Sequence, residues 1–316
     1  MTLLPVWVKP GPFYLYAALV LGLLLDRLYP WHSGLLLRVH PVHTGFVLAR
    51  RLAPPGSGRA RGVLAWLVVM VSHLAPAALL LYAAWLASPI VWVAVASVIV
   101  KLSCPLYPLL DAASRFYRCA SRGDWVCGRG YAQWLVRRNV YELGDAHVVS
   151  AVLESLAESL VDGYTSPILY YMLLGPLGAL AQRMVNTLDS ALGYLDGGYR
   201  EAGWLSARAD DVVNYIPARL TALAIIAASC ISRLGCRSAL YSWLQWSGAT
   251  LSPNAGHPMA ALAGALGAWL EKPGFYTLNP GGRGPRVEDV PVASRLVALA
   301  ALLYTLAVAP LALIQF

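Results

Sequence analysis

The feature that most constrains the fold of this chain is one long run of apolar residues. A soluble domain could not bury so long a run. Residues 62–103 are almost wholly apolar, and a helix needs only about 20 such residues to cross a bilayer. The run is therefore long enough for two spans, with Pro76 or the Ser88-Pro89 pair as the possible breaks. Only 13% of all residues are charged, against about 25% in a soluble domain. The sequence predicts an integral membrane protein with the lipid bilayer as a partner.

Other apolar runs predict further spans at residues 12–29, 148–182, 212–235 and 291–314. No stretch shows the two-residue alternation of a barrel strand, so we expect helices throughout. No clear cleavage site follows the first run, which favours a retained helix over a signal peptide. No long polar linker divides the chain. We therefore predict an all-α, polytopic integral membrane protein whose residues 1–316 form a single membrane-embedded helical domain.

The net charge of +8 comes mainly from arginines in short segments beside the apolar runs. This pattern is typical of cytoplasmic loops and membrane headgroup contacts, so no nucleic-acid partner is expected. It predicts a multi-pass protein of the cell membrane with cytoplasmic helical segments and an active site on that side. The arginines lie on both sides of residues 62–103: Arg50, Arg51, Arg59 and Arg61 before it, and Arg115, Arg118, Arg122, Arg129, Arg137 and Arg138 after it.

The cysteines and two early histidines give weaker signals. The five cysteines form no CxxC pair and no zinc-site spacing, so we expect ordinary small residues in a reducing compartment. His40 and His43 are three apart and could bind a metal, but no third ligand is near them in sequence.

The acidic residues are concentrated in one part of the chain. Ten of the sixteen fall between residues 142 and 211. Glu154, Glu158 and Asp162 recur every four residues and would share one helix face. Charges at this depth are costly, so a divalent cation or a cationic substrate would compensate them. The alternative is an amphipathic helix whose acids face the cytoplasm.

The segment 148–182 allows two topologies. It can cross the membrane once, or it can be re-entrant, broken at Asp162-Gly163 and Pro167. Broken helices are tolerated at membrane depth where they line a cavity. We favour the broken or re-entrant acidic helix, which would place residues 183–211 on the cytoplasmic side.

The next polar segment combines carboxylates, amides and arginines. Between residues 183 and 219, the pairs Asn186/Asp189, Arg208/Asp211 and Asp211/Asn214 are each three apart and would share helix faces. This mixture suits a site that holds metal and phosphate, although a polar loop with internal salt bridges is an alternative.

Farther on, Ser252-Pro253-Asn254 predicts a turn and helix start, followed by small residues suited to close packing. The backbone N–H groups of that turn could bind an anion, and His257 has either a packing or a chemical role.

Together these motifs resemble the CobD/CbiB family of cobalamin-biosynthesis membrane proteins, the adenosylcobinamide-phosphate synthases. The resemblance runs in order over most of the chain, although Arg137-Arg138-Asn139-Val140 stands where members often have Gly-Arg-Asp-Thr, and Ser159 where Asn is common. The matching motifs are Asp26, HPV at 40–42, ESLAES-VDG at 154–163, NTLDSALGY at 186–194, ARADDVVNYIPARLTA at 207–222 and SPNAGHP at 252–258.

The resemblance implies a carbon–nitrogen ligase that uses ATP and Mg²⁺. The reaction joins a propionate of the corrinoid substrate adenosylcobyric acid to aminopropanol O-phosphate, or to aminopropanol, and gives adenosylcobinamide phosphate or adenosylcobinamide. Other membrane-associated corrinoid enzymes are possible partners. The alternatives are a non-catalytic sensor-like protein, like distant relatives linked to β-lactamase regulation, and a transporter, since acids within membranes often mark ion pathways.

The residues of the acidic and amide segments suit this chemistry, because a carboxylate must be activated, as an acyl phosphate, before an amine attacks it. Metal ions stabilise charge in phosphoryl transfer, and arginine offers a planar fork for phosphate. We assign catalytic and metal-binding roles to six carboxylates: Glu154, Glu158, Asp162, Asp189, Asp210 and Asp211. Six further residues are assigned to binding substrate or phosphate: Arg183, Asn186, Arg208, Asn214, Arg219 and Asn254.

Overall fold

The computed structural model describes residues 4–194 and 197–314, and its contacts divide the chain into two compact units. Unit 1 consists of Met1–Pro105, Ser166–Val213 and Val308–Phe316. Unit 2 consists of Leu106–Thr165 and Asn214–Ala307. Each unit is assembled from segments far apart in the sequence, and the prediction of a single domain stays a prediction.

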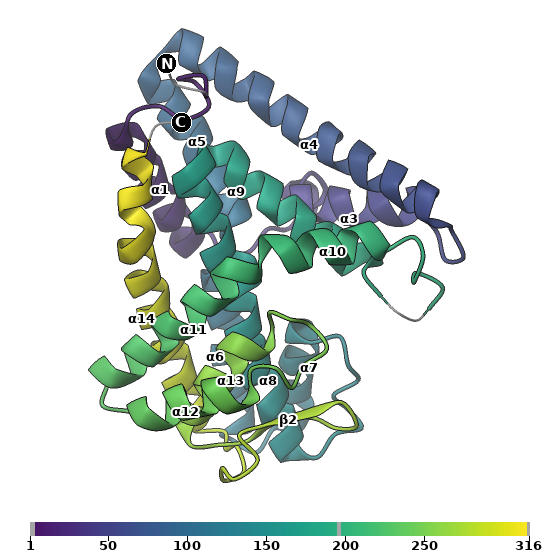
Figure 1. Ribbon diagram of the computed structural model, residues 1–316, viewed down its shortest axis with the longest axis vertical. Coiled ribbons are helices and arrows are strands. Elements are labelled where there is room, and N and C mark those ends of the chain that lie inside the picture. Colours follow the sequence, from purple (N-terminus) through teal and green to yellow (C-terminus); the bar gives the residue numbers. More distant parts are fainter. Residues whose placement is uncertain (1–3, 195–196, 315–316) are drawn as a thin grey trace. The chain divides into compact units, whose positions relative to one another are not determined.

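Unit 1 is helical, as predicted (Figure 1). Its helix α9 contacts α3, α4, α5 and α10, and α1 packs on α5. The elements are α1 (Pro12–Leu28), α2 (Gly34–Arg38), α3 (Pro41–Leu52), α4 (Arg59–Ala87), α5 (Pro89–Ser103), α9 (Ser166–Leu192), α10 (Trp204–Val213) and the 3-10 helix η2 (Ala309–Leu313).

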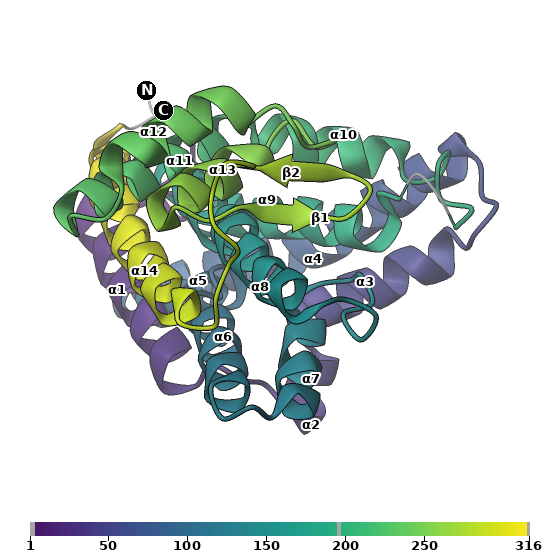
Figure 2. The ribbon, with the colours of Figure 1, turned by 90° about the horizontal axis from the view of Figure 1, so that it is seen from below.

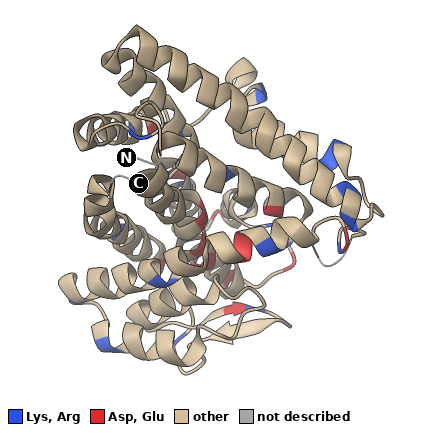
Figure 3. Cartoon of the chain, turned by 45° about the horizontal axis from the view of Figure 1, so that its top comes forward, with Lys and Arg blue, Asp and Glu red and all other residues tan. Residues whose placement is uncertain are grey.

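The predicted division of the long apolar run is right at one position and wrong at the other. Helix α4 continues through Pro76, so the predicted break there is wrong. A proline in a membrane helix is tolerated where its surroundings satisfy the freed carbonyl. The chain does break at Ser88, whose Oγ accepts a hydrogen bond from the backbone N–H of Val91 (3.2 Å) and so caps α5. Beyond Arg61, α4 carries no charged residue (Figure 3), which suits a lipid-facing helix.

Close helix contacts in unit 1 depend on small residues. A Cβ built on Gly22 of α1 would meet Val100 Cγ1 at 2.6 Å and the Ser97 carbonyl oxygen at 2.8 Å, both on α5. One built on Gly62 of α4 would meet the Ala202 carbonyl oxygen at 2.0 Å. Small side chains let backbones approach this closely, and dispersion contacts then stabilise helices that have no hydrophobic drive to associate in lipid.

Unit 2 is a second helical assembly with a small β-hairpin (Figure 2). Helices α6 and α7 form a hairpin, α13 contacts α8, α11 and α12, and strand β1 lies along α8. The elements are α6 (Tyr107–Ala120), α7 (Trp125–Leu135), α8 (Asp145–Leu160), the π-helical turn η1 (Val161–Thr165), α11 (Tyr215–Ile231), α12 (Cys236–Trp246), α13 (Gly256–Leu266), β1 (Leu270–Lys272), β2 (Tyr276–Leu278) and α14 (Asp289–Val308).

The β-hairpin was not predicted. Strands β1 and β2 pair antiparallel, with Leu270 opposite Leu278 and Lys272 opposite Tyr276. The turn between them contains Pro273 and Gly274, and Gly274 has a φ of 78°. This Pro-Gly pair is the local turn signal that could have revealed the hairpin, but three-residue strands show too little alternation to be recognised.

The acidic helix is not broken at Pro167, which lies within α9, and at the other predicted break it has a π-helical turn. Asp162 and Gly163 lie in the π-helical turn η1, between α8 and α9. Thr165 donates its hydroxyl to the Leu160 carbonyl (3.2 Å) and the hydroxyl oxygens of Thr165 and Thr221 are 2.6 Å apart. A second break was missed: α9 kinks at Gly175, which has a φ of 71° and precedes Pro176. Whether the segment crosses once or re-enters the membrane stays a prediction.

The described residues contain four helical segments long and apolar enough to cross a membrane. The bent pair α10 and α11, broken at Asn214, raises this number to five if it forms one span. These findings confirm a polytopic helical membrane protein. Helix α1 has 17 residues, or about 25 Å at 1.5 Å per residue, slightly less than the hydrocarbon thickness of about 30 Å. The four segments are Arg59–Ala87, Pro89–Ala120, Asp145–Leu192 and Asp289–Leu313.

The prediction of five reduced cysteines is wrong for four of them. Cys119 and Cys127 form a disulfide that joins the end of α6 to α7. Cys230 and Cys236 form a second disulfide that joins the end of α11 to the start of α12. Each disulfide links two consecutive helices across the turn between them. The spacing of the cysteines in the sequence does not by itself show that they lie close together. Cys104 is free and buried.

The contact between α1 and α5 gives the first testable prediction. Gly22→Ala should destabilise the protein by about 1–3 kcal/mol, because the added methyl group overlaps Val100 and a backbone oxygen. Gly130→Ala is the matched control on α7, where a new Cβ meets nothing within 4 Å and should stabilise the helix slightly. Unfolding in detergent would measure both, and equal effects would refute the close packing.

Candidate functional site

The twelve predicted site residues divide equally between the two units. The structure thus brings together smaller groups within each unit, which are described separately below. Unit 2 contains Glu154, Glu158, Asp162, Asn214, Arg219 and Asn254, and unit 1 contains Arg183, Asn186, Asp189, Arg208, Asp210 and Asp211.

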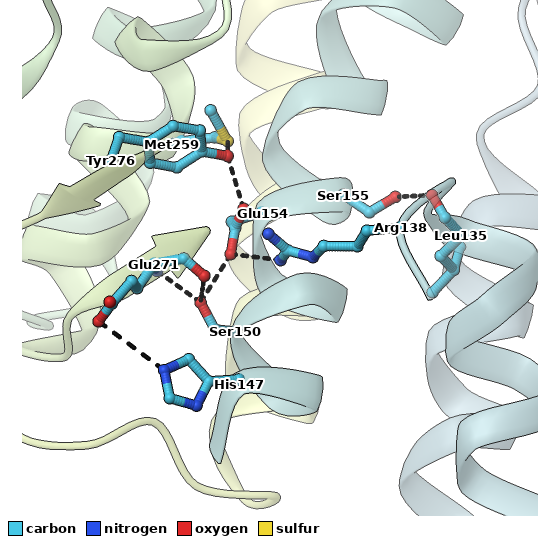
Figure 4. Close-up of polar contacts among 9 residues, drawn as sticks. All are labelled: Leu135, Arg138, His147, Ser150, Glu154, Ser155, Met259, Glu271 and Tyr276. Atoms are coloured by element: carbon cyan, nitrogen blue, oxygen red, sulfur yellow. Dashed lines mark hydrogen bonds and ion pairs between the residues drawn. The ribbon is translucent and has the colours of Figure 1, made fainter. Parts of the chain in front are cut away.

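Glu154 is the centre of a buried network in unit 2 (Figure 4). It lies on α8 and its side chain is only 5% exposed. One carboxylate oxygen, Oε1, accepts hydrogen bonds from Arg138 Nη2 (2.7 Å) and Ser150 Oγ (2.7 Å). The other, Oε2, accepts one from the Tyr276 hydroxyl (2.6 Å). The negative charge is therefore satisfied by the protein itself, as a buried carboxylate requires.

This network ties α8 to the β-hairpin. Ser150 Oγ also accepts a hydrogen bond from the backbone N–H of Glu271 (2.8 Å) on β1. Burial, and next the Glu154 carboxylate, raise the pKa of Tyr276, which keeps its hydroxyl a donor. Three donors on both oxygens favour a positioning role for Glu154 over metal ligation, while the metal assignment itself stays a prediction.

The other two acids of the stripe have different surroundings. Glu158 is exposed and Asp162 is partly buried. Asn214, buried between α10 and α11, donates from Nδ2 to Asp162 Oδ1 (3.3 Å). The π-helical turn contains one residue more per hydrogen-bonded turn than an α-helix, so it shifts Asp162 from the regular four-residue register. Such turns are frequent at functional sites.

Arg219 and Asn254 form a second polar group in unit 2. Arg219 Nη1 donates to Asn254 Oδ1 (3.3 Å), and its guanidinium stacks on the Tyr215 ring, with Cζ 3.4 Å from the centroid. The predicted turn is confirmed, because Ser252 Oγ accepts hydrogen bonds from the backbone N–H groups of Asn254 and Ala255. These N–H groups already have acceptors, so the turn is a weaker anion site than the sequence suggested.

His257 has a partner that the sequence did not reveal. Trp243 on α12 donates its indole Nε1–H to His257 Nδ1 (2.8 Å). An indole nitrogen can only donate, so Nδ1 carries the lone pair and the neutral ring is protonated at Nε2. Burial, with a smaller effect of Arg219, lowers the pKa of His257 to about 4. His257 is therefore a neutral hydrogen-bond donor near pH 7.

In unit 1, Asn186 links an arginine to a carboxylate. Arg183 Nη1 donates to Asn186 Oδ1 (3.2 Å), and Asn186 Nδ2 donates to Asp210 Oδ1 (3.4 Å). These contacts connect α9 with α10, and Asn186 is 8% exposed. The sequence spacing paired Asn186 with Asp189, whereas in the structure Asn186 is hydrogen-bonded to Asp210.

The remaining candidates of unit 1 lie nearby on the same two helices. Arg208 and Asp211 form the predicted ion pair at 3.2 Å on α10. Asp189 lies against Gly193, where a built Cβ would be 1.9 Å from Asp189 Oδ1. A side chain at residue 193 would therefore displace the carboxylate, which explains why glycine follows it in this motif.

A metal site would have to be completed by a ligand. Among the described residues, no group of three or more His, Cys, Asp or Glu side chains could hold a metal ion. Mg²⁺, however, is commonly bound by one or two carboxylates together with substrate phosphates and water. Asp162 and Asp210, each beside an asparagine, fit that type of site.

Sequence reasoning missed Arg138, Tyr276 and Trp243. Arg138 was counted among the topology-setting arginines, although it is 16 residues from Glu154 and hydrogen-bonded to it. The one sequence signal for Arg138 is its position next to Asn139, where this chain departs from the family pattern. Asn139, where a carboxylate is common, donates to Glu142 Oε1 (2.7 Å) and accepts from the Tyr141 backbone, so it stabilises a local turn. No sequence signal indicated Tyr276 or Trp243.

Comparisons with a family model and with individual known proteins point to the same family. The family model described as "CobD/Cbib protein" matches residues 19–304. A protein of Aeropyrum pernix named "Probable cobalamin biosynthesis protein CobD" is 47% identical over 296 residues, which cover 94% of this chain and 92% of the relative. No solved structure matches.

Two further relatives match over shorter stretches. The "Cobalamin biosynthesis protein CobD" of Dehalococcoides mccartyi is 40% identical over 60% of this chain and 61% of the relative. A "Probable cobalamin biosynthesis protein CobD" of Methanothermobacter thermautotrophicus is 42% identical over 57% of this chain and 61% of the relative.

The Glu154 network gives a stability prediction. Glu154→Gln should cost about 3–5 kcal/mol, because it leaves the Arg138 charge without its buried counter-ion. Asp145→Asn is the matched control, since the Arg129–Asp145 pair has an Asp145 side chain that is 53% exposed and should contribute at most about 1 kcal/mol. Detergent unfolding curves of the two variants would test this, and similar losses would contradict a buried charge pair.

The neutral state of His257 predicts a pH dependence. An unfolded histidine titrates near pH 6.5, whereas folding lowers the pKa of His257 to about 4. The unfolded chain therefore takes up this proton first, and stability should fall as the pH drops from about 6.5 to about 4. His257→Asn should make this fall shallower, while the same change at exposed His43 should not. Melting temperatures measured across this range would decide, and an unchanged slope in His257→Asn would contradict the assignment.

Proposed function

This chain belongs to the CobD/CbiB family, and from that premise we propose that it is an ATP-dependent carbon–nitrogen ligase. Its place in cobalamin biosynthesis follows from the family and from relatives that carry that role in their names. The proposed reaction forms an amide between a propionate of adenosylcobyric acid and the amine of aminopropanol O-phosphate or aminopropanol. The observation that carries the proposal is the family match over residues 19–304.

The residues can accommodate the Mg²⁺ that the reaction implies. Asp162 in unit 2 and Asp210 in unit 1 offer carboxylate oxygens, and each carboxylate is oriented by a hydrogen bond from an asparagine, Asn214 or Asn186. Such hard oxygen donors are the ligands that Mg²⁺ prefers. When bound, Mg²⁺ would neutralise charge on a transferred phosphoryl group.

The arginines support the binding of anionic substrates. Arg219 is held in place by its stacking on Tyr215 and by Asn254. A guanidinium fixed in this way loses little freedom when it forms paired hydrogen bonds to a phosphate or carboxylate. Arg183 donates a hydrogen bond to Asn186 Oδ1 (3.2 Å), which orients its guanidinium. We assign Arg219 in unit 2, and Arg183 and the mostly exposed Arg208 in unit 1, to substrate binding.

The neighbouring neutral groups suit a reaction in which an amine must attack as a free base. His257 donates from a neutral ring and adds no positive charge beside Arg219. The basic loops on both sides of residues 62–103 support a site on the cytoplasmic side of the membrane, where ATP and the corrinoid are available.

The decisive experiment is reconstitution of the reaction. Purified protein with adenosylcobyric acid, ATP, Mg²⁺ and aminopropanol phosphate should give the amide, detected by mass spectrometry. Asp210→Asn combined with Asp211→Asn should reduce its formation by at least about 100-fold, because ligands of a phosphoryl-transfer metal would be lost. Product from the double variant at the wild-type rate would remove both residues from the site.

Glu142→Gln combined with Glu288→Gln is the charge-matched control, because both glutamates are exposed. This variant should retain the wild-type rate. Folded wild-type protein that forms no amide from active substrates would overturn the ligase proposal and favour the sensor-like or transport alternatives.

A further inference from the structure

A cluster of basic side chains lies in unit 1 and adjoins Asn186, which accepts a hydrogen bond from one of its members, Arg183. Lys101 comes from α5, His32 from the segment before α2, His40 from the start of α3 and Arg183 from α9. Lys101 is 7% exposed, and Asp26, whose carboxylate acts electrostatically on Lys101, is 1% exposed. A buried ammonium is costly, so the fold maintains this cluster at a price in stability.

Hydrogen bonds fix the protonated nitrogen of each imidazole. Lys101 Nζ lies 2.6 Å from His32 Nε2 and 3.4 Å from His32 Nδ1. An ammonium group can only donate, so the nearer nitrogen, Nε2, accepts. The backbone N–H of Val42 donates to His40 Nδ1 (3.2 Å). The ring protons therefore lie on the opposite nitrogens, Nδ1 of His32 and Nε2 of His40. Both histidines present an N–H donor, and the two rings are 4.8 Å apart.

This arrangement argues against the metal site that the spacing of His40 and His43 suggested. A metal needs an imidazole lone pair, and the lone pairs of His32 and His40 are occupied. The positive charges of Lys101 and Arg183 would also repel a cation. Burial, followed by the effects of His32, Arg183 and Lys101, lowers the pKa of His40 to about 3, so its ring is neutral near pH 7.

The cluster instead has the properties of an anion site. Its side chains offer N–H donors, its fixed charge is positive, and phosphate oxygens are acceptors that form strong bonds with such donors. His32 and His40 are partly exposed and His43 is exposed, so a ligand can approach from the segment that joins α2 and α3. We propose that Lys101, His32 and His40, with Arg183, bind a phosphate group of a substrate.

The identity of the phosphate-bearing ligand is taken from the proposed function, so this part of the inference rests on that proposal. A phosphate monoester occurs on aminopropanol phosphate, and ATP also carries phosphate groups. A lipid headgroup shares the phosphate chemistry, so the test must separate these sources.

Kinetics of Lys101→Gln provide the first arm. If the cluster binds the amine substrate, the KM for aminopropanol phosphate should rise about tenfold or more, the loss expected for one charge-assisted hydrogen bond, while the KM for aminopropanol stays unchanged. If it binds ATP, the KM for ATP should rise with either amine. Lys272→Gln, on the β-hairpin, is the matched control and should change neither value. Unchanged KM values in Lys101→Gln would overturn the proposal.

His40→Asn keeps the variant test usable if Lys101→Gln fails to fold. Asparagine preserves a side-chain oxygen that can cap α3 but removes the Nε2–H donor. It should raise the same KM as Lys101→Gln and leave the melting temperature near the wild-type value. A normal KM in this folded variant would contradict a role of His40 in phosphate binding.

Direct binding separates this inference from the ligase proposal. The full chain, labelled with ¹⁵N-histidine in phosphatidylcholine nanodiscs, should show shifts of the His32 and His40 signals on titration with inorganic phosphate. If no amide forms but these shifts occur, the ligase proposal fails and the phosphate site stands. Shifts that occur only with phosphatidylglycerol nanodiscs would identify a lipid site and overturn the substrate assignment, and no shift with any probe would overturn the site.

Discussion

A charge placed among apolar helices must be paired, and this constraint organises the polar residues of the chain. Glu154 meets it most fully, with three donors on its two carboxylate oxygens. Because those donors come from α8, the segment after α7 and the β-hairpin, a single carboxylate fixes three parts of unit 2. The cost of leaving any partner unpaired explains why the hairpin, with only two short strands, has a defined position against α8.

The apolar part of the fold depends on the size of side chains. Lipid does not drive helices together as water does, so the contacts that hold α1 on α5 and α12 on α13 must come from close packing. Gly22 and Gly264 allow these approaches, since a Cβ at Gly264 would be 2.2 Å from the Ser238 carbonyl oxygen. By contrast, much of α4 is exposed and uncharged, as expected for a lipid-facing surface. Packing and exposure therefore divide the apolar residues into two classes that hydropathy alone does not distinguish.

The sequence was sufficient for features that depend on local chemistry. The end of α4 at Ser88 and the turn at Ser252 follow from capping residues and prolines, and the irregular turn near Asp162 lies beside a glycine. Features that depend on residues meeting across the fold were not accessible. Tyr276 lies 122 residues from its partner Glu154, and Trp243 lies 14 residues from its partner His257. The two disulfides required knowledge of how helices turn back. Pro76 was misjudged because its effect on a helix depends on the surroundings of the freed carbonyl.

Among the candidate residues, the pairs Asn186–Asp210 and Asp162–Asn214 show why the motifs combine amides with acids, although the spacing alone suggested other pairs.

The hydrogen-bond partners of a polar residue also determine which ligand it can bind. In the basic cluster of unit 1, Lys101 and the Val42 amide use the imidazole lone pairs, and the N–H groups remain as donors. Beside Asp210 and Asp162, asparagines donate to the carboxylates, and carboxylate oxygens have further lone pairs that can bind a cation. Histidines that would serve a metal in one setting thus serve an anion in another. The proposed ligase would need both kinds of site, one for a phosphate and one for its metal. Unit 1 contains a donor set and an acceptor set near α9.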